Sequence, residues 1–347
     1  RAWSEHTLPT SPEAWMVRVA RNLLIDGHRR QTRRQAYERE VLTQSPPLWA
    51  PRAFDDDLLR LVVAACDPVL DLHEQVALTL STVIGLSGGE IARAFQVSPR
   101  TIEQRLVRAR RRLRQRRHAF ESPEAEDTGA RIEGVLRVVH LTFNEGYWSQ
   151  GALRPQLCRL AEDLARALVD VLDDDAEALG LLATLVLHRA RLPSRHDAEG
   201  LPIPLERQDR SAWDAAAISE AEALLQRALA ARRPGPFQIE AAIASLHMRA
   251  ATPEAIDWLQ ITALYGRLRT FRPSPMVRLN HALAMARVDA PKALRELDAL
   301  LQLDGMRHLP IAHLAHADIL ARCGDPDAAA EALTRAEVGA DPATARE

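Results

Sequence analysis

Apolar residues recur every three to four positions along most of the chain, the spacing that places them on one face of an α-helix. Beyond residue 130 this pattern is regular, and breaks at Pro, Gly or Asp divide it into ten segments. The predicted helices span residues 131–147, 155–172, 175–191, 212–231, 237–250, 253–270, 275–288, 291–301, 309–323 and 326–337. We therefore expect an all-α fold whose larger part, residues 131–340, is an array of helices.

The last part of this array repeats itself. Two stretches, which begin at Pro275 and Pro310, each contain two helices and align over about 34 residues. Small Ala and Gly residues stand where the paired helices would cross. Because stacked units of this kind bury a continuous core and leave a concave face, we expect tetratricopeptide-like (TPR-like) repeats that bind a partner.

Residues 58–118 contain the signals of a helix-turn-helix domain. An apolar helix ends at Gly85, and Ser87 with Glu90 forms a capping box that starts a short second helix. A tight turn follows, and Ser98 with Pro99 starts a third helix. Two capped helices separated by a short turn predict the motif with which many proteins enter the major groove of DNA.

The third helix of this domain has an apolar face and a polar face. Its apolar positions recur from Ile102 to Leu113 at helical spacing, so we expect them to be buried. Its first turns present Arg, Gln and Thr, which can meet base edges, and its later arginines can bind phosphate. The predicted DNA-binding residues are Arg100, Thr101, Gln104, Arg105, Arg108, Arg111 and Arg112. The alternative is a helical hairpin whose basic face only contacts solvent.

The N-terminal part of the chain predicts one further helix and a linker. Residues 12–30 have an amphipathic pattern, with Ser11 and Pro12 at the start and several arginines on the polar face. Such a helix could lie along a DNA backbone. Residues 36–57 contain three prolines and end in a run of aspartates, which is typical of a linker.

The first third of the chain resembles the extracytoplasmic-function (ECF) group of bacterial sigma factors. Region two of that group is similar to the stretch AWMVRVARNLLIDGHRR, and region four is similar to QVALTLSTVIGLSGGEIARAFQVSPRTIEQRLVRARRRLR. In the family, region two reads the −10 promoter element and region four reads the −35 element. The resemblance therefore implies that the third helix above reads −35. It also implies further DNA-binding residues in region two, which are Arg21, Asn22, Asp26 and Arg29.

The resemblance also implies domain boundaries and partners. Residues 1–35 are expected to be the C-terminal part of region two, incomplete at the N-terminal end, and residues 58–118 to be region four. The chain as a whole resembles the ECF subgroup with a C-terminal TPR-like extension, through LTFNEGYWSQ, DAEGLPIPLERQDRSAWD and RPGPFQIEAAIASLH. In that subgroup the extension is thought to control sigma activity. The implied partners are promoter DNA, the RNA polymerase core, and an unknown protein or signal at the array.

Charge and composition agree with this division of the chain. The formal net charge of −2 hides 20 arginines against 13 acidic residues in residues 1–120, and 25 basic against 34 acidic residues in the remainder. A basic part is typical of a module that binds nucleic acid. The three cysteines lie far apart, and no apolar run is long enough to span a membrane. We expect a cytoplasmic protein without a disulfide, a metal site or a membrane contact.

A group of polar residues in the extension allows two interpretations, a metal or small-ligand pocket, or packing and capping. Packing and capping are favoured because several of these residues stand just before a predicted helix, where acids cap the backbone. The group is Asn144, Glu145, Tyr147, Arg195, His196, Asp197, Glu206, Asp209, Arg210, Trp213 and Asp214.

The sequence contains no motif of a known enzyme class, such as HExxH, a Gly-rich phosphate loop or a nucleophile elbow. We therefore expect no catalytic residues and no cofactor. Two alternatives to a sigma factor remain open. One is a protein-interaction scaffold in which the helical array is the working part, and the other is a stand-alone helix-turn-helix regulator.

Overall fold

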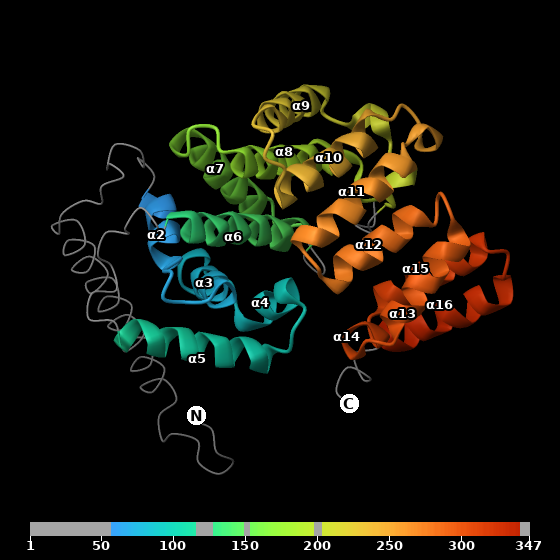
Figure 1. Ribbon diagram of the computed structural model, residues 1–347, viewed down its shortest axis with the longest axis horizontal. Coiled ribbons are helices and arrows are strands. Elements are labelled where there is room, and N and C mark those ends of the chain that lie inside the picture. The colour runs from blue at the N-terminus through green and yellow to red at the C-terminus, as the bar shows by residue number, and fades with distance from the viewer. Residues whose placement is uncertain (1–56, 116–127, 149–152, 198–202, 341–347) are drawn as a thin grey trace, which may run out of the picture.

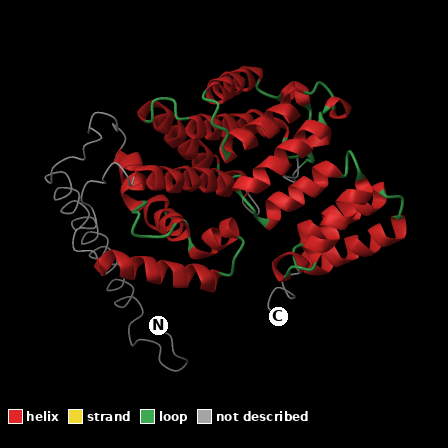
Figure 2. Cartoon of the chain, in the orientation of Figure 1, coloured by secondary structure: helices red, strands yellow, loops and turns green. Residues whose placement is uncertain are grey.

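The computed structural model describes residues 57–115, 128–148, 153–197 and 203–340, which fold into helices joined by short loops. Figure 2 shows the helices and loops, and no β-strand occurs in the described part of the chain. None of the described helices is long and apolar enough to cross a membrane. The predicted all-α fold is confirmed.

Four helices precede the array. They are α2 (Asp57–Ala65), α3 (Leu72–Thr79), α4 (Gly88–Phe95) and α5 (Pro99–Gln115), and a π-helical turn (Leu80–Ile84) continues α3. The array consists of α6 (Thr128–Trp148), α7 (Pro155–Val171), α8 (Ala176–Ala190), α9 (Ala215–Ala230), α10 (Pro236–Arg249), α11 (Trp258–Phe271), α12 (Pro275–Met285), α13 (Ala290–Leu301), α14 (Asp304–Arg307), α15 (Pro310–Arg322) and α16 (Pro326–Ala340).

Each of the ten helices predicted for the array is present, and the differences lie at their ends. The predicted helix 253–270 starts at Trp258 instead, because Asp257 caps it through the amide of Gln260 at 2.9 Å. Pro253 belongs to a separate 3₁₀ turn, Pro253–Ala255. Helix α9 likewise starts after its cap, Asp214, and the short helix α14 was not predicted.

Helix α6 joins the two groups of helices (Figure 1). It packs against α2, α3 and α4 on one side and against α7 and α8 on another. Its side chains Val138, Val139 and Phe143 are fully buried. One hydrophobic core therefore runs without a break from Leu59 of α2 to Met248 of α10. Each fully buried side chain of this kind contributes about 1.5–3 kcal/mol, so this contact is a large one.

The remaining helices form smaller cores. Buried residues of α12, α13 and α15 pack together, and those of α15 and α16 form a further cluster. Helices α12 and α13 are neighbours in space, as are α15 and α16, and α13 packs against α15. The C-terminal part of the chain is therefore a stack of helix pairs.

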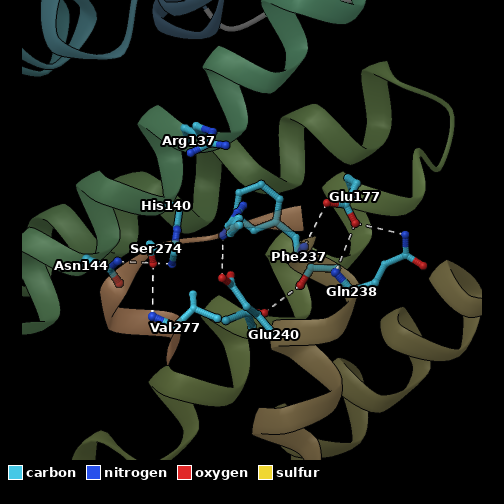
Figure 3. Close-up of polar contacts among 12 residues, drawn as sticks. Arg137, His140, Asn144, Glu177, Phe237, Gln238, Glu240, Ser274 and Val277 are labelled. Atoms are coloured by element: carbon cyan, nitrogen blue, oxygen red, sulfur yellow. Dashed lines mark hydrogen bonds and ion pairs between the residues drawn. The ribbon is translucent and has the colours of Figure 1, made fainter. Parts of the chain in front are cut away.

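Helices α8 and α10 approach each other closely because glycine occupies the crossing point. A Cβ atom on Gly180 would lie 2.6 Å from the backbone nitrogen of Gln238. Next to it, the carboxylate of Glu177 accepts hydrogen bonds from the backbone amides of Phe237 and Gln238, at 2.9 and 3.2 Å (Figure 3). Burial raises the pKa of Glu177. The start of α10 is therefore fixed on α8 by a cap that comes from another helix.

The replacement Gly180→Ala should lower the free energy of unfolding by about 1–3 kcal/mol, because the new methyl group would force α8 and α10 apart. The measurement is urea unfolding followed by circular dichroism. Gly305→Ala is the matched control, since a Cβ there meets nothing within 4 Å and the stability should not change. Equal stability of the two variants would contradict the close helix crossing.

Candidate DNA-binding site

Helices α3, α4 and α5 form a helix-turn-helix whose ends are fixed by the predicted caps. The hydroxyl of Ser87 accepts a hydrogen bond from the amide of Glu90 at 3.3 Å, and the Glu90 carboxylate accepts one from the amide of Ser87 at 2.6 Å. Gln96 ends α4 in the left-handed conformation, with φ of 53°. Ser98 then caps α5 through the amide of Thr101 at 3.2 Å. The turn between α4 and α5 is thus set by local hydrogen bonds.

Helix α5 buries one face and exposes the other. Ile102, Leu106 and Ala109 are buried against α3 and α4, as predicted from their spacing. On the opposite face, polar side chains extend from the first turn to the last (Figure 1 shows the helix at the edge of the molecule). Exposed predicted residues without a partner in the described part of the chain are Arg100, Gln104, Arg108 and Arg111.

Three other predicted DNA-binding residues of α5 take part in contacts within the protein. The hydroxyl of Thr101 lies 2.9 Å from that of Ser98 at the start of the helix. Arg105 is half-buried, and its guanidinium group lies over the ring of Phe95 at 5.5 Å. Arg112 forms an ion pair with Glu74, with 2.5 Å between the charged atoms.

The Glu74 contact gives Arg112 a structural role. Glu74 is 2% exposed and belongs to the capping box of α3 together with Asp71. A buried carboxylate is strongly stabilised by a paired guanidinium group. Arg112 therefore holds the last turns of α5 against the start of α3, while its side chain stays 47% exposed. The predicted region-two residues Arg21, Asn22, Asp26 and Arg29 lie outside the described residues.

An ion-pair network connects α4 to the array. Arg93 of α4 lies 3.1 Å from Glu145 of α6. Arg154, which precedes α7, lies 2.5 Å from Glu90 of α4 and 3.8 Å from Glu145. Hydrogen bonds from Ser87, together with Arg154, hold the pKa of Glu90 below its ordinary value. Glu145 is only 6% exposed, so the two arginines neutralise a buried charge.

Four of the other polar residues singled out in the extension have packing and capping roles. Asp209 and Asp214 cap the turn Arg210–Ala212 and helix α9. Arg210 donates to the carbonyl oxygens of His247 and Ala250, and the indole of Trp213 donates to Ser194 at 2.8 Å. In the described part of the chain, no group of three or more His, Cys, Asp or Glu residues could hold a metal ion.

Two family models match this chain. Residues 69–113 match the model described as sigma-70, region 4, which covers α3, α4 and most of α5. Residues 131–229 match a family of unknown function, DUF6596, which covers α6 to α9. The helix-turn-helix predicted from the sequence is thus a sigma-70 region 4, and this supports a DNA-binding role of the sigma-factor type.

One relative aligns over most of the chain. It is an uncharacterized protein, R00370, of Rhizobium meliloti (strain 1021), 40% identical over 302 residues. The alignment covers 84% of this chain and 71% of the relative. The chain belongs to the family of this rhizobial protein. No solved structure matches the chain. The family includes both the region 4 helices and the array, because the alignment is longer than either part alone.

Sequence reasoning missed the contact between α4 and the array. Glu145 was interpreted as a packing residue, and Arg93 and Arg154 were not singled out. Arg93 and Glu145 are 52 positions apart, so no helical spacing connects them. The one sequence signal for this contact is an acidic residue within the apolar pattern of α6, because a buried carboxylate needs a partner.

The replacement Glu145→Gln should loosen α4 from α6, because Arg93 and Arg154 lose the buried charge between them. Both arginines are partly exposed, so we expect a cost of about 1 kcal/mol, or about fivefold faster amide exchange in α4. Hydrogen–deuterium exchange measures this. Glu133→Gln on the same helix is the control, since Arg137 is the one ion-pair partner of Glu133 among the described residues. Unchanged exchange in α4 would show that apolar packing alone holds it.

Proposed function

We propose that this protein is a sigma factor that directs RNA polymerase to specific promoters and reads the −35 element with α5. The observation that carries the proposal is the sigma-70 region 4 match at residues 69–113, on helices whose outer face exposes arginines that have no ion-pair partner in the described part of the chain. A helix of this kind places its N-terminal turns in the major groove. Arg100 and Gln104 are then next to base edges, and Arg111 is next to phosphate.

The array is proposed to be a TPR-like regulatory extension. The stacked pairs α12–α13 and α15–α16 support this, because paired helices are the repeating unit of such folds. An unknown protein partner or signal would act on it. The ion pairs of α4 with Glu145 of α6 and with Arg154 before α7 give the array a direct contact with the helix-turn-helix. We further propose that the protein is cytoplasmic and is not an enzyme.

The test of the function is transcription in vitro. Purified RNA polymerase core with this protein should initiate from a defined pair of sequences in a promoter library, and core alone should not. Two other outcomes would replace the proposal. Specific DNA binding by the protein without polymerase-dependent initiation would indicate a stand-alone regulator. Capture of a protein partner with no DNA selectivity would indicate a scaffold.

The replacement Arg108→Ala should weaken binding to the selected DNA by about 1–3 kcal/mol, with the loss concentrated at one position of the −35 element. Arg108 is exposed and has no hydrogen bond or ion pair in the described part of the chain, so the melting temperature should stay the same. Arg105→Ala should lower both DNA affinity and melting temperature, since Arg105 also packs on Phe95. Fluorescence anisotropy on single-base variants of the site measures the affinities.

Arg335→Ala, in α16, is the control for loss of one positive charge and should leave DNA affinity unchanged. An equal loss by Arg108→Ala on every DNA sequence would indicate that this side chain binds phosphate, and its contribution should then fall as salt rises. No loss on any sequence would contradict the assignment of α5 as the reading helix.

A further inference from the structure

A cavity of about 320 Å³ lies inside the array, between α6, α8, α10, α11 and α12. Figure 3 shows His140 and Asn144 of α6, Glu240 of α10 and Val277 of α12 coming together there. The volume is within the range of sites for small molecules. No contact of the helix-turn-helix uses these side chains, so the cavity is separate from the DNA-binding site.

Arg191, at the end of α8, lines this cavity and carries an uncompensated charge. It is 8% exposed, and its Nε donates to the hydroxyl of Tyr147 at 2.9 Å. Within the described residues, no carboxylate lies within ion-pair distance of Arg191. A phenol is a hydrogen-bond acceptor but no counter-ion, and a buried unpaired charge costs free energy. The guanidinium group therefore favours an anion in the cavity.

The other titratable groups of the cavity wall do not cancel this charge. Burial lowers the pKa of His140, His188 and His247, and the charge of Arg191 adds to the lowering of the last two. The pKa of His247 falls to about 4. The three histidines are therefore neutral at neutral pH. Glu240 is compensated by Arg272, with 2.5 Å between the charged atoms.

Two polar atoms of the wall have no hydrogen-bond partner in the described part of the chain. They are Oε2 of Glu240 and Nδ1 of His247, and both are buried. Buried polar atoms almost always have a partner in a folded protein. Because Oε2 of Glu240 is an acceptor, it calls for a donor from outside the chain, such as a hydroxyl or amino group.

The donor and the anion belong at opposite ends of the cavity. Glu240 and His247 lie on α10 seven residues apart, which corresponds to about 10 Å along the helix. Arg191 is at the His247 end, since α8 and α10 meet at their starts through Glu177 and Phe237 and Arg191 follows the last residue of α8. Between the two ends, α10 contributes the apolar side chains of Ile243 and Ala244.

We propose that this cavity binds a small organic carboxylate with an apolar middle and a hydroxyl or amino group at its far end. The guanidinium of Arg191 binds the carboxylate, and Glu240 accepts the hydrogen bond from the other end. This inference does not depend on the proposed sigma-factor function, because ligand binding can be measured without DNA or polymerase.

The probe for the test is 3-(4-hydroxyphenyl)propionate, measured by isothermal titration calorimetry with the whole chain. Two analogues remove one group each. The propionamide, which has no charge, should bind at least about tenfold more weakly, as expected for loss of a hydrogen-bonded charge. The acid without the hydroxyl group, 3-phenylpropionate, should bind several-fold more weakly, since Oε2 of Glu240 then receives no hydrogen bond from the ligand.

Variants of the protein locate the site. Arg191→Gln should weaken binding of the probe by about tenfold or more. Ala244→Leu should abolish binding by filling the cavity with no change of charge. Arg227→Gln, on the exposed face of α9, is the control and should bind as the parent does. Circular dichroism checks that each variant is folded. If Arg191→Gln does not fold, the affinities of the parent chain for the three ligands test the proposal instead.

Three results would overturn the proposal. The first is no heat of binding with any of the three probes at millimolar concentration. The second is equal affinity for the acid and the amide, which would mean that Arg191 selects no anion. The third is unchanged affinity in Ala244→Leu, which would place the ligand elsewhere on the chain.

Discussion

The arrangement of the molecule depends on the burial of α6 from two sides. Val138, Val139 and Phe143 of this helix are fully buried, and they do not all lie on one side of it, so more than one neighbouring helix must cover them. Helices α2 to α4 provide one cover, and α7 and α8 provide the other. The helix-turn-helix is therefore part of the same core as the first helices of the array. Helix α5 is held on this core, since its own apolar face packs on α3 and α4.

Burial of apolar side chains stabilises the contact between α4 and α6, and charged side chains determine how the two helices are oriented. Hydrophobic attraction is non-directional, so it does not by itself determine how α4 lies across α6. The buried carboxylate of Glu145 is directional, because it needs donors in particular places. Arg93 of α4 provides a donor close to this carboxylate, and Arg154 approaches it from the start of α7. Arg154 also binds Glu90, which caps α4, so the cap of the helix-turn-helix and the array share one side chain.

The sequence predicted the helices well because their signals are local. Caps such as Ser87 with Glu90 and the spacing of Ile102 and Leu106 involve residues within a few positions of each other. Contacts between distant helices leave no such signal. The ion pair of Arg112 with Glu74 gives a predicted DNA-binding residue a contact within the protein, and it joins residues 38 positions apart. Only the packing of α5 on α3 brings these two side chains together.

Helix α6 connects the cavity physically to the helix-turn-helix. His140 and Asn144, four positions apart, share the face of α6 that lines the cavity. Glu145 is one position further on, about 100° around the helix, and points to α4. Protein interiors are packed as densely as organic crystals, so a displacement of α6 at one face must be accommodated at the other. The cavity of the array and helix α4 of the helix-turn-helix are thus attached to different faces of one well-packed helix.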